Sequence, residues 1–153
     1  MAKPTTVRFG KMLIKLATTA APTVFVAPCG FTSKSLALTK NLEEVNIPDC
    51  DNPDDPAWVG RDVSSLTASV SGEGVLAEES LDTWMNAFNS TNPAPIEIEL
   101  VLAGTASFVW KGLMHVSSVT ISGEQGGRVT ISVEMQSDGE LTGTLYPDRT
   151  TRT

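Results

Sequence analysis

The chain has 153 residues, a length that fits one domain with its own core. Apolar residues make up 41% of it and charged residues 19%, and Ser, Thr and Val recur along its length, which favours strands over helices. The net charge of −7 excludes a protein that grips nucleic acid through clustered Lys and Arg, and no apolar run approaches membrane-spanning length. We therefore expect a single, mainly β domain over residues 1–153, with no membrane partner.

The start of the chain predicts a hairpin. Apolar and more polar residues alternate over residues 12–16 and 24–26, and a turn is expected at residues 20–22. The stretch before Cys29 superficially resembles a lipoprotein signal, but a lysine and two prolines interrupt it. The hairpin is the favoured interpretation.

Two long strands with one polar face each are predicted next. Leu36, Leu38 and Leu42 share one face of residues 33–47, and Leu66, Ala68 and Val70 share one face of residues 65–71, while the odd-numbered positions of both stretches are mostly polar, as in strands with one buried face. The two strands are expected to pair across the loop between them. The polar positions are Ser33, Ser35, Thr39, Asn41 and Glu43 in the first strand and Ser65, Thr67, Ser69 and Ser71 in the second.

The loop between these strands, residues 46–61, is long, acidic and stiffened by three prolines. Ordering such a loop costs about 1–2 kcal/mol of backbone entropy per residue, a cost that a partner can offset. Tryptophan is among the residue types most enriched in interface anchors. We therefore expect the loop to contact a partner through Asn46, Asp49, Asp51, Asp54, Asp55, Trp58 and Arg61.

Residues 78–89 predict the one helix, because apolar side chains recur there at helical spacing. Ser80 is expected to cap its start and Asn89 to end it. Strand alternation then returns, and glycine-rich turns separate the strands. The expected fold is an antiparallel β-sandwich or partial barrel of seven or eight strands with one flanking helix. The later strands are expected around residues 96–102, 108–110, 119–121 and 129–135.

Motifs of catalysis and cofactor binding are weak. Residues 72–77 match a dinucleotide fingerprint, but the strand before them is half polar and acidic residues follow, so a glycine-rich turn is favoured. His115 is the only histidine and is expected to have a structural partner. The loop lacks the Gly and Glu of an EF-hand, which leaves another kind of cation site as the alternative. We expect no enzyme activity, no metal and no cofactor, and we expect Cys29 and Cys50 to be thiols.

The order of these pieces resembles the major tail tube protein of long non-contractile-tailed phages, and gene transfer agents use tube proteins of the same type. The likeness covers nearly the whole chain, and its strongest pieces are the return strand GRDVSSLTASVSGEG and the ending SDGELT. Members of this family form a β-sandwich flanked by a helix. They assemble as six-fold rings that stack into a hollow tube conducting DNA.

The resemblance implies roles for particular segments. The loop at residues 46–61 would reach a neighbouring ring, polar arms at residues 1–10 and 139–153 would do similar work, and the polar strand faces would line the lumen. Left without a partner, such arms should be mobile. The nine polar positions include no Lys or Arg, so DNA would pass without specific binding.

The resemblance also implies a place and partners. The protein would be part of a virion tail, assembled in the host cytoplasm, with further copies of itself and other tail components at the tube ends as partners. We expect the loop's charge to meet arginines across a subunit boundary, which would make assembly salt-sensitive. The candidates are Arg61, Arg128, Arg149 and Arg152.

Two other functions fit a β-sandwich. A monomeric binding or adhesion module should gather exposed aromatics on one face, and only Trp58 qualifies here. A related secretion-tube protein would also form rings, and the sequence alone separates it poorly from a tail tube.

Overall fold

A computed structural model describes residues 2–20, 23–26 and 30–148. Within these ranges the chain forms eight strands and one α-helix, and every strand pair is antiparallel. The predicted mainly β fold with one flanking helix is confirmed, although the sheet does not close into a barrel. The elements are the 3-10 helix η1 (Phe9–Lys11), β1 (Met12–Ala20), β2 (Thr23–Val26), β3 (Phe31–Asn46), β4 (Val59–Val75), α1 (Glu78–Asn89), β5 (Ala94–Val101), β6 (Ser107–Ser122), β7 (Thr130–Ser137) and β8 (Thr142–Tyr146).

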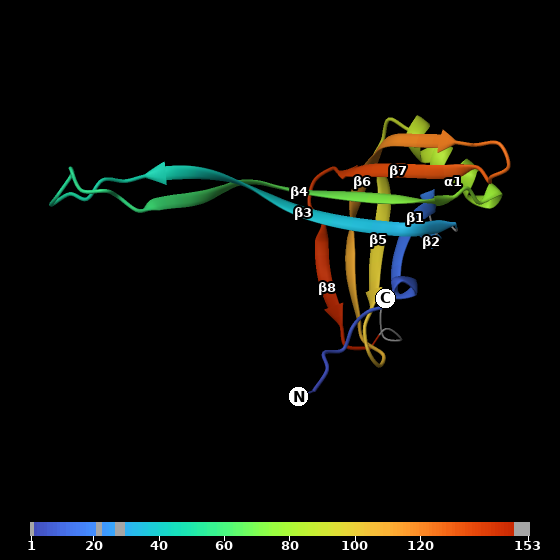
Figure 1. Ribbon diagram of the computed structural model, residues 1–153, viewed down its shortest axis with the longest axis horizontal. Helices are drawn as coiled ribbons and strands as arrows, with labels where there is room; N and C mark the ends of the chain where they lie inside the picture. The colour runs from blue at the N-terminus through green and yellow to red at the C-terminus, as the bar shows by residue number, and fades with distance from the viewer. Residues whose placement is uncertain (1, 21–22, 27–29, 149–153) are drawn as a thin grey trace.

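The sheet folds over itself into two layers because β6 belongs to both. Its first half, up to Met114, pairs with β5 and β8, and its second half pairs with β7. The first layer is therefore β2-β1-β5-β6 with β8, and the second is β6-β7-β4-β3. Figure 1 shows β3, β4 and β7 crossing β1 and β5 at a steep angle. This is a sandwich of two crossed layers.

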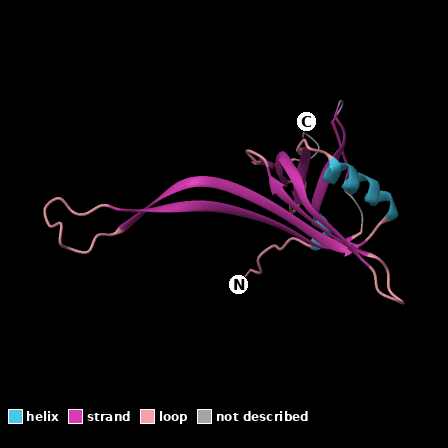
Figure 2. Ribbon diagram, turned by 90° about the horizontal axis from the view of Figure 1, so that it is seen from above, coloured by secondary structure: helices cyan, strands magenta, loops and turns pink. Residues whose placement is uncertain are grey.

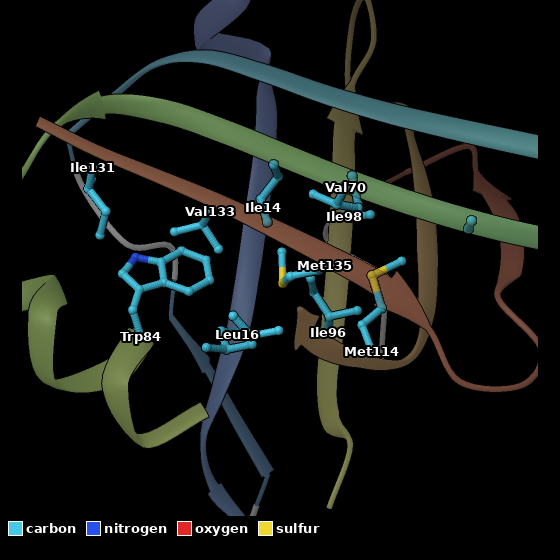
Figure 3. Packing of buried hydrophobic residues seen from close by; sticks show 12 residues of the cluster. Ile14, Leu16, Val70, Trp84, Ile96, Ile98, Met114, Ile131, Val133 and Met135 are labelled. Atoms are coloured by element: carbon cyan, nitrogen blue, oxygen red, sulfur yellow. The ribbon is translucent and has the colours of Figure 1, made fainter. Parts of the chain in front are cut away.

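The core lies between these layers, where the apolar positions of both face each other (Figure 3). Trp84 of α1 is 1% exposed and lies 5.6 Å from the ring of Phe31, so the helix seals one opening of the sandwich. No helix in the described ranges is long and apolar enough to cross a bilayer. The buried apolar cluster comprises Ile14, Leu16, Ala68, Val70, Trp84, Ile96, Ile98, Met114, Val116, Ile131, Val133 and Met135.

The glycine pair that suggested a turn lies inside β4, so that prediction is wrong. Gly72 and Gly74 are buried. A Cβ at Gly74 would overlap the backbone of Gly30 and Thr32, and a Cβ at Gly72 would lie 3.2 Å from the ring of Phe31. These glycines allow β3 to approach β4 closely, and no dinucleotide-binding loop exists there.

Three other details differ from expectation or lie outside the description. Ser80 is a buried residue within α1 and not its cap, because the helix begins at Glu78 after Ala77 without a side-chain cap. Asn89 ends the helix as predicted. β8 falls within the segment predicted as a C-terminal arm, so part of that segment is paired to the body. Of the turn predicted at residues 20–22, Ala20 is the last residue of β1 and residues 21–22 lie outside the described residues, as does the Cys29 thiol.

Candidate assembly surfaces

A long two-stranded extension leaves the body. β3 and β4 pair over their whole length, but β7 supports β4 only from Ser69 onward. Residues 39–67, here called the arm, therefore project beyond the sandwich, as Figures 1 and 2 show. A hairpin of two strands is marginally stable alone in water, so this shape indicates a surface made to be covered.

The tip of the arm is shorter than the predicted loop. Asn46 pairs with Val59 and Arg61 pairs with Glu44, so the unpaired tip is residues 47–58. It holds two local hydrogen bonds: the Asp51 amide donates to Asp49 Oδ1 at 3.1 Å, and the Asp55 amide donates to the Asn52 carbonyl oxygen at 3.1 Å.

The side chains of the tip face solvent. All four aspartates and the free Cys50 thiol are exposed, and Trp58 is 96% exposed. No group of His, Cys, Asp or Glu within the described ranges could hold a metal ion. The tip therefore presents four negative charges and a bare indole.

Arg61 forms an ion pair within its own arm. Its guanidinium lies 3.2 Å from Glu44 Oε1, and both side chains are more than half exposed, so the pair contributes little to stability. This contact competes with the predicted role of Arg61 as a receiver of charge from another subunit. Arg149 and Arg152 lie outside the described residues.

The nine predicted polar positions lie on one face of the paired strands. Directly opposed residues of antiparallel strands point to the same side of a sheet. Thr39 faces Thr67, and Asn41 faces Ser65 with its side-chain Nδ2 donating to Ser65 Oγ at 2.8 Å. The remaining opposed pairs on this face are Ser35–Ser71, Ser33–Glu73, Ala37–Ser69 and Glu43–Asp62.

This polar face continues across β7 and β6, an extension that the sequence interpretation missed. Ser69 and Ser71 lie opposite Gln136 and Glu134, and Glu134 lies opposite Ser118. The strand positions on this face include four acidic residues and His115, and none of them is Lys or Arg. The positions added by β7 and β6 are His115, Ser118, Thr120, Ser122, Thr130, Ser132, Glu134 and Gln136.

His115 has the structural partner that was predicted. Its Nε2 lies 3.5 Å from Asp138 Oδ2, and both side chains are about half exposed. The contact joins β6 to the residue after β7 and gives no support to general base chemistry.

The opposite face of the arm carries exposed apolar side chains, with the exposed Lys40 among them, opposite Leu66. Leu38, Leu42, Val63 and Leu66, here called the apolar strip, are each at least 50% exposed. At the root of the arm the strip borders a groove of about 910 Å³ whose other wall includes Leu141. Such patches mark interaction sites in soluble proteins.

Two strand edges of the second layer lack a strand partner within the described part of the chain. β3 pairs only with β4, and beyond Met114 β6 pairs only with β7. An unpaired edge exposes amide and carbonyl groups that can pair with another chain. The second layer thus offers one open edge on each side.

Comparison with known proteins identifies the family and the fold of the chain. A family model described as phage tail tube protein matches residues 6–143. The chain has the fold of a protein in the tail of an empty gene transfer agent particle with C6 symmetry, at 17% identity, a TM-score of 0.71 and coverage of 91% of this chain and 99% of that one.

Two further solved structures share the fold. The SPP1 tail tube matches at 11% identity and a TM-score of 0.65, covering 94% of this chain and 81% of that one. The tube terminator complex of an extracellular contractile injection system matches at 14% identity and a TM-score of 0.60, covering 94% and 99%. No curated protein sequence matches significantly. With its family model spanning nearly the whole chain, the protein belongs to the phage tail tube protein family.

Proposed function

We propose that the chain polymerises with its own copies into rings, six to a ring, that stack into the hollow tail tube through which DNA passes. The observation that carries this proposal is the second layer, which has two open strand edges and an arm whose apolar strip is uncovered. A head-to-tail contact whose rotation closes gives a ring. The number six rests on the C6 symmetry of the gene transfer agent tail that shares the fold.

Strand direction supports this closure. The second layer has four antiparallel strands, so its two edge strands, β3 and β6, run in opposite directions. A copy rotated about the ring axis therefore presents its β6 edge antiparallel to the β3 edge of its neighbour. Such pairing satisfies both edges and closes a barrel, which removes them as sites of uncontrolled aggregation.

The polar face is the side we assign to the channel. Its nine sequence-predicted positions and their extension on β7 and β6 carry acidic and hydroxyl groups. Each ring would repeat this pattern, so the wall would repel phosphate and let DNA slide. The tip of the arm, with Trp58 and its aspartates, would contact another subunit, and the terminal segments would assist.

We also propose that assembly takes place in the host cytoplasm and that other tail components bind at the tube ends.

The purified protein should form rings or tubes in negative-stain images, and its light scattering should rise above a critical concentration. A protein that stays strictly monomeric at high concentration would contradict the proposal and favour the binding-module alternative.

Adding positive charge to the polar face should make the tube retain DNA. Glu73→Lys with Glu134→Lys places two cations per subunit on this face, and phosphate contacts of that kind weaken steeply with salt. We expect DNA to co-sediment with variant tubes at low salt and to be released as salt rises.

The matched control is Glu79→Lys with Asp82→Lys on α1, which changes the net charge equally at exposed positions away from this face. Control tubes should retain no more DNA than the parent tubes. Equal retention by both variants would show that the polar face does not line the channel.

A further inference from the structure

We infer that the arm of one copy binds the basic N-terminal segment, residues 2–11, of another copy. The inference rests on the proposed function and names the surface that the arm meets. It draws on three independent features of the chain: how charge is distributed along it, what the arm leaves uncovered and what the N-terminal segment exposes.

Charge is separated along the chain. Six of the 11 basic residues lie in the first 42 positions, which contain no Asp or Glu. Residues 43–62 hold seven of the 18 acidic residues and only one basic residue, Arg61. Opposite charges at two surfaces steer encounter and fix register between partners. The most acidic part of this protein therefore has its complement in the same sequence.

A segment that covers the apolar strip must match its apolar side chains as well as the charge of the tip. Leu42 and Val63 lie opposite each other, and Leu38 and Leu66 lie nearer the root of the arm on the same face. Lys40 lies opposite Leu66 on this face, so the apolar contacts are made around one cation. An occupant that covers them must present apolar side chains in an extended conformation, and it must place cations toward the acidic tip.

The N-terminal segment has these properties. Residues 2–8 lie outside helix and strand, Val7 and Phe9 are 44% and 50% exposed, and Arg8 stands between them. Seven extended residues span roughly 23 Å, as do the seven residues 38–44 along the strip. With Val7 and Phe9 over the strip, Lys3 lies far enough along to reach toward the tip.

The segment leaves the body at a fixed point. Lys34 Nζ donates to the Met12 carbonyl oxygen at 2.8 Å and lies 4.5 Å from the centre of the Phe9 ring. Partial burial lowers the pKa of Lys34 below its ordinary value. This contact between β3 and the start of β1 directs the preceding residues away from the core.

The two surfaces do not meet within one copy. Figure 1 shows the arm extending to one side of the body while the N-terminal segment leaves toward another, far from the tip. Contact between them therefore joins different copies. The partner of the arm is a second copy of this chain, and every subunit both gives and receives one contact.

Photo-crosslinking in assembled tubes tests this inference. A benzophenone amino acid replaces Val7, and the tubes are grown from equal amounts of ¹⁵N-labelled and unlabelled protein. Mass spectrometry should find residue 7 joined to a peptide from residues 38–67, with half of the products isotopically mixed. Val129, also 44% exposed but on the loop after β6, is the matched control position and should not capture the arm.

The outcomes separate this inference from the proposed function. Tubes in which position 7 captures its own chain or another segment would overturn the inference and leave the tube intact. Failure of the unmodified protein to form tubes would reject both.

Charge reversal gives a second test. Arg8→Glu should raise the critical concentration for assembly about three-fold or more, since each subunit loses an attraction and gains a repulsion. Arg128→Glu makes the same charge change at an exposed loop residue that the sequence also offers as a partner for the arm, and it should leave the critical concentration within about two-fold if the N-terminal segment is the partner. Adding Glu44→Lys, which changes a residue next to Leu42 on the face of the strip, to the Arg8→Glu chain should lower the critical concentration again. Equal effects of Arg8→Glu and Arg128→Glu, or no recovery, would contradict the inference.

Discussion

Deleting residues 49–57 and joining the ends through Asn-Gly is expected to leave a folded monomer that no longer polymerises. The two hydrogen bonds described for the tip are local to it, and its aspartates are exposed, so the sandwich should lose little free energy of unfolding. Together with Pro48, Asn-Gly forms a three-residue connection between Ile47 and Trp58, and Gly suits the left-handed last residue of such a hairpin loop. Circular dichroism and a thermal melt should match those of the parent chain, while light scattering should show no rings or tubes.

A companion variant keeps the length of the tip and removes its charge. Changing Asp49, Asp51, Asp54 and Asp55 to Asn should weaken assembly and reduce its dependence on salt, because attraction between exposed charges is screened. If the deletion unfolded the chain, the tip would be part of the fold. If it left assembly intact, the arm would have no role in the tube.

Trp84→Ala is expected to lower the free energy of unfolding by about 3–5 kcal/mol, the usual cost of removing a large aromatic from a packed core. Trp84 is 1% exposed and points from α1 toward Leu16, Ile131 and Val133, as Figure 3 shows. The void left by the indole would remove packing contacts from both layers of the sandwich. Urea titration measures this change in the free energy of unfolding, at a protein concentration too low for assembly.

Phe88 provides the matched control on the same helix, because it is 45% exposed. Phe88→Ala should cost about 1 kcal/mol or less, as surface substitutions usually do. Similar losses for the two variants would mean that α1 does not close the sandwich through Trp84.

Residue parity was enough to predict the paired strands and their polar face. Polar and apolar residues alternate strictly from Ser65 to Ser71, so the face of each residue follows from its position alone. The pairing of the two strands then needed only a hairpin, whereas their register, with Thr39 opposite Thr67, is known from the structure. The helix was equally clear, since its apolar spacing differs from that of the strands around it.

The extension of the polar face could not be predicted, although its alternation was visible. Ser132 and Glu134 stand between the buried Ile131, Val133 and Met135, so their side of β7 was readable. What the sequence does not contain is that β7 lies beside β4. That neighbour relation arises from β6 passing from one layer to the other, which is a tertiary property.

Buried acids were also missed. Glu97 and Glu99 alternate with isoleucines and read as a polar face, yet they are 3% and 1% exposed. Lys15 Nζ lies 2.7 Å from Glu99 Oε2, which provides the charge partner that a buried carboxylate needs. Alternation shows which residues share a face, but it does not show that both faces of β5 are covered.

β8 escaped prediction for a different reason. Its residues are all exposed or half-buried, and it includes Gly143, so no apolar face marks it as a strand. It exists because the edge of β6 is available to pair with it. Short edge strands of this kind are defined by their neighbour.

A helical cryo-electron microscopy reconstruction of tubes grown from the purified protein tests the central claim most directly. The account predicts six copies per ring, β3 of each copy paired with β6 of the next, and Ser69, Glu73 and Glu134 facing the channel. A channel lined by the apolar strip, or a particle in which the β3 and β6 edges stay unpaired, would contradict it.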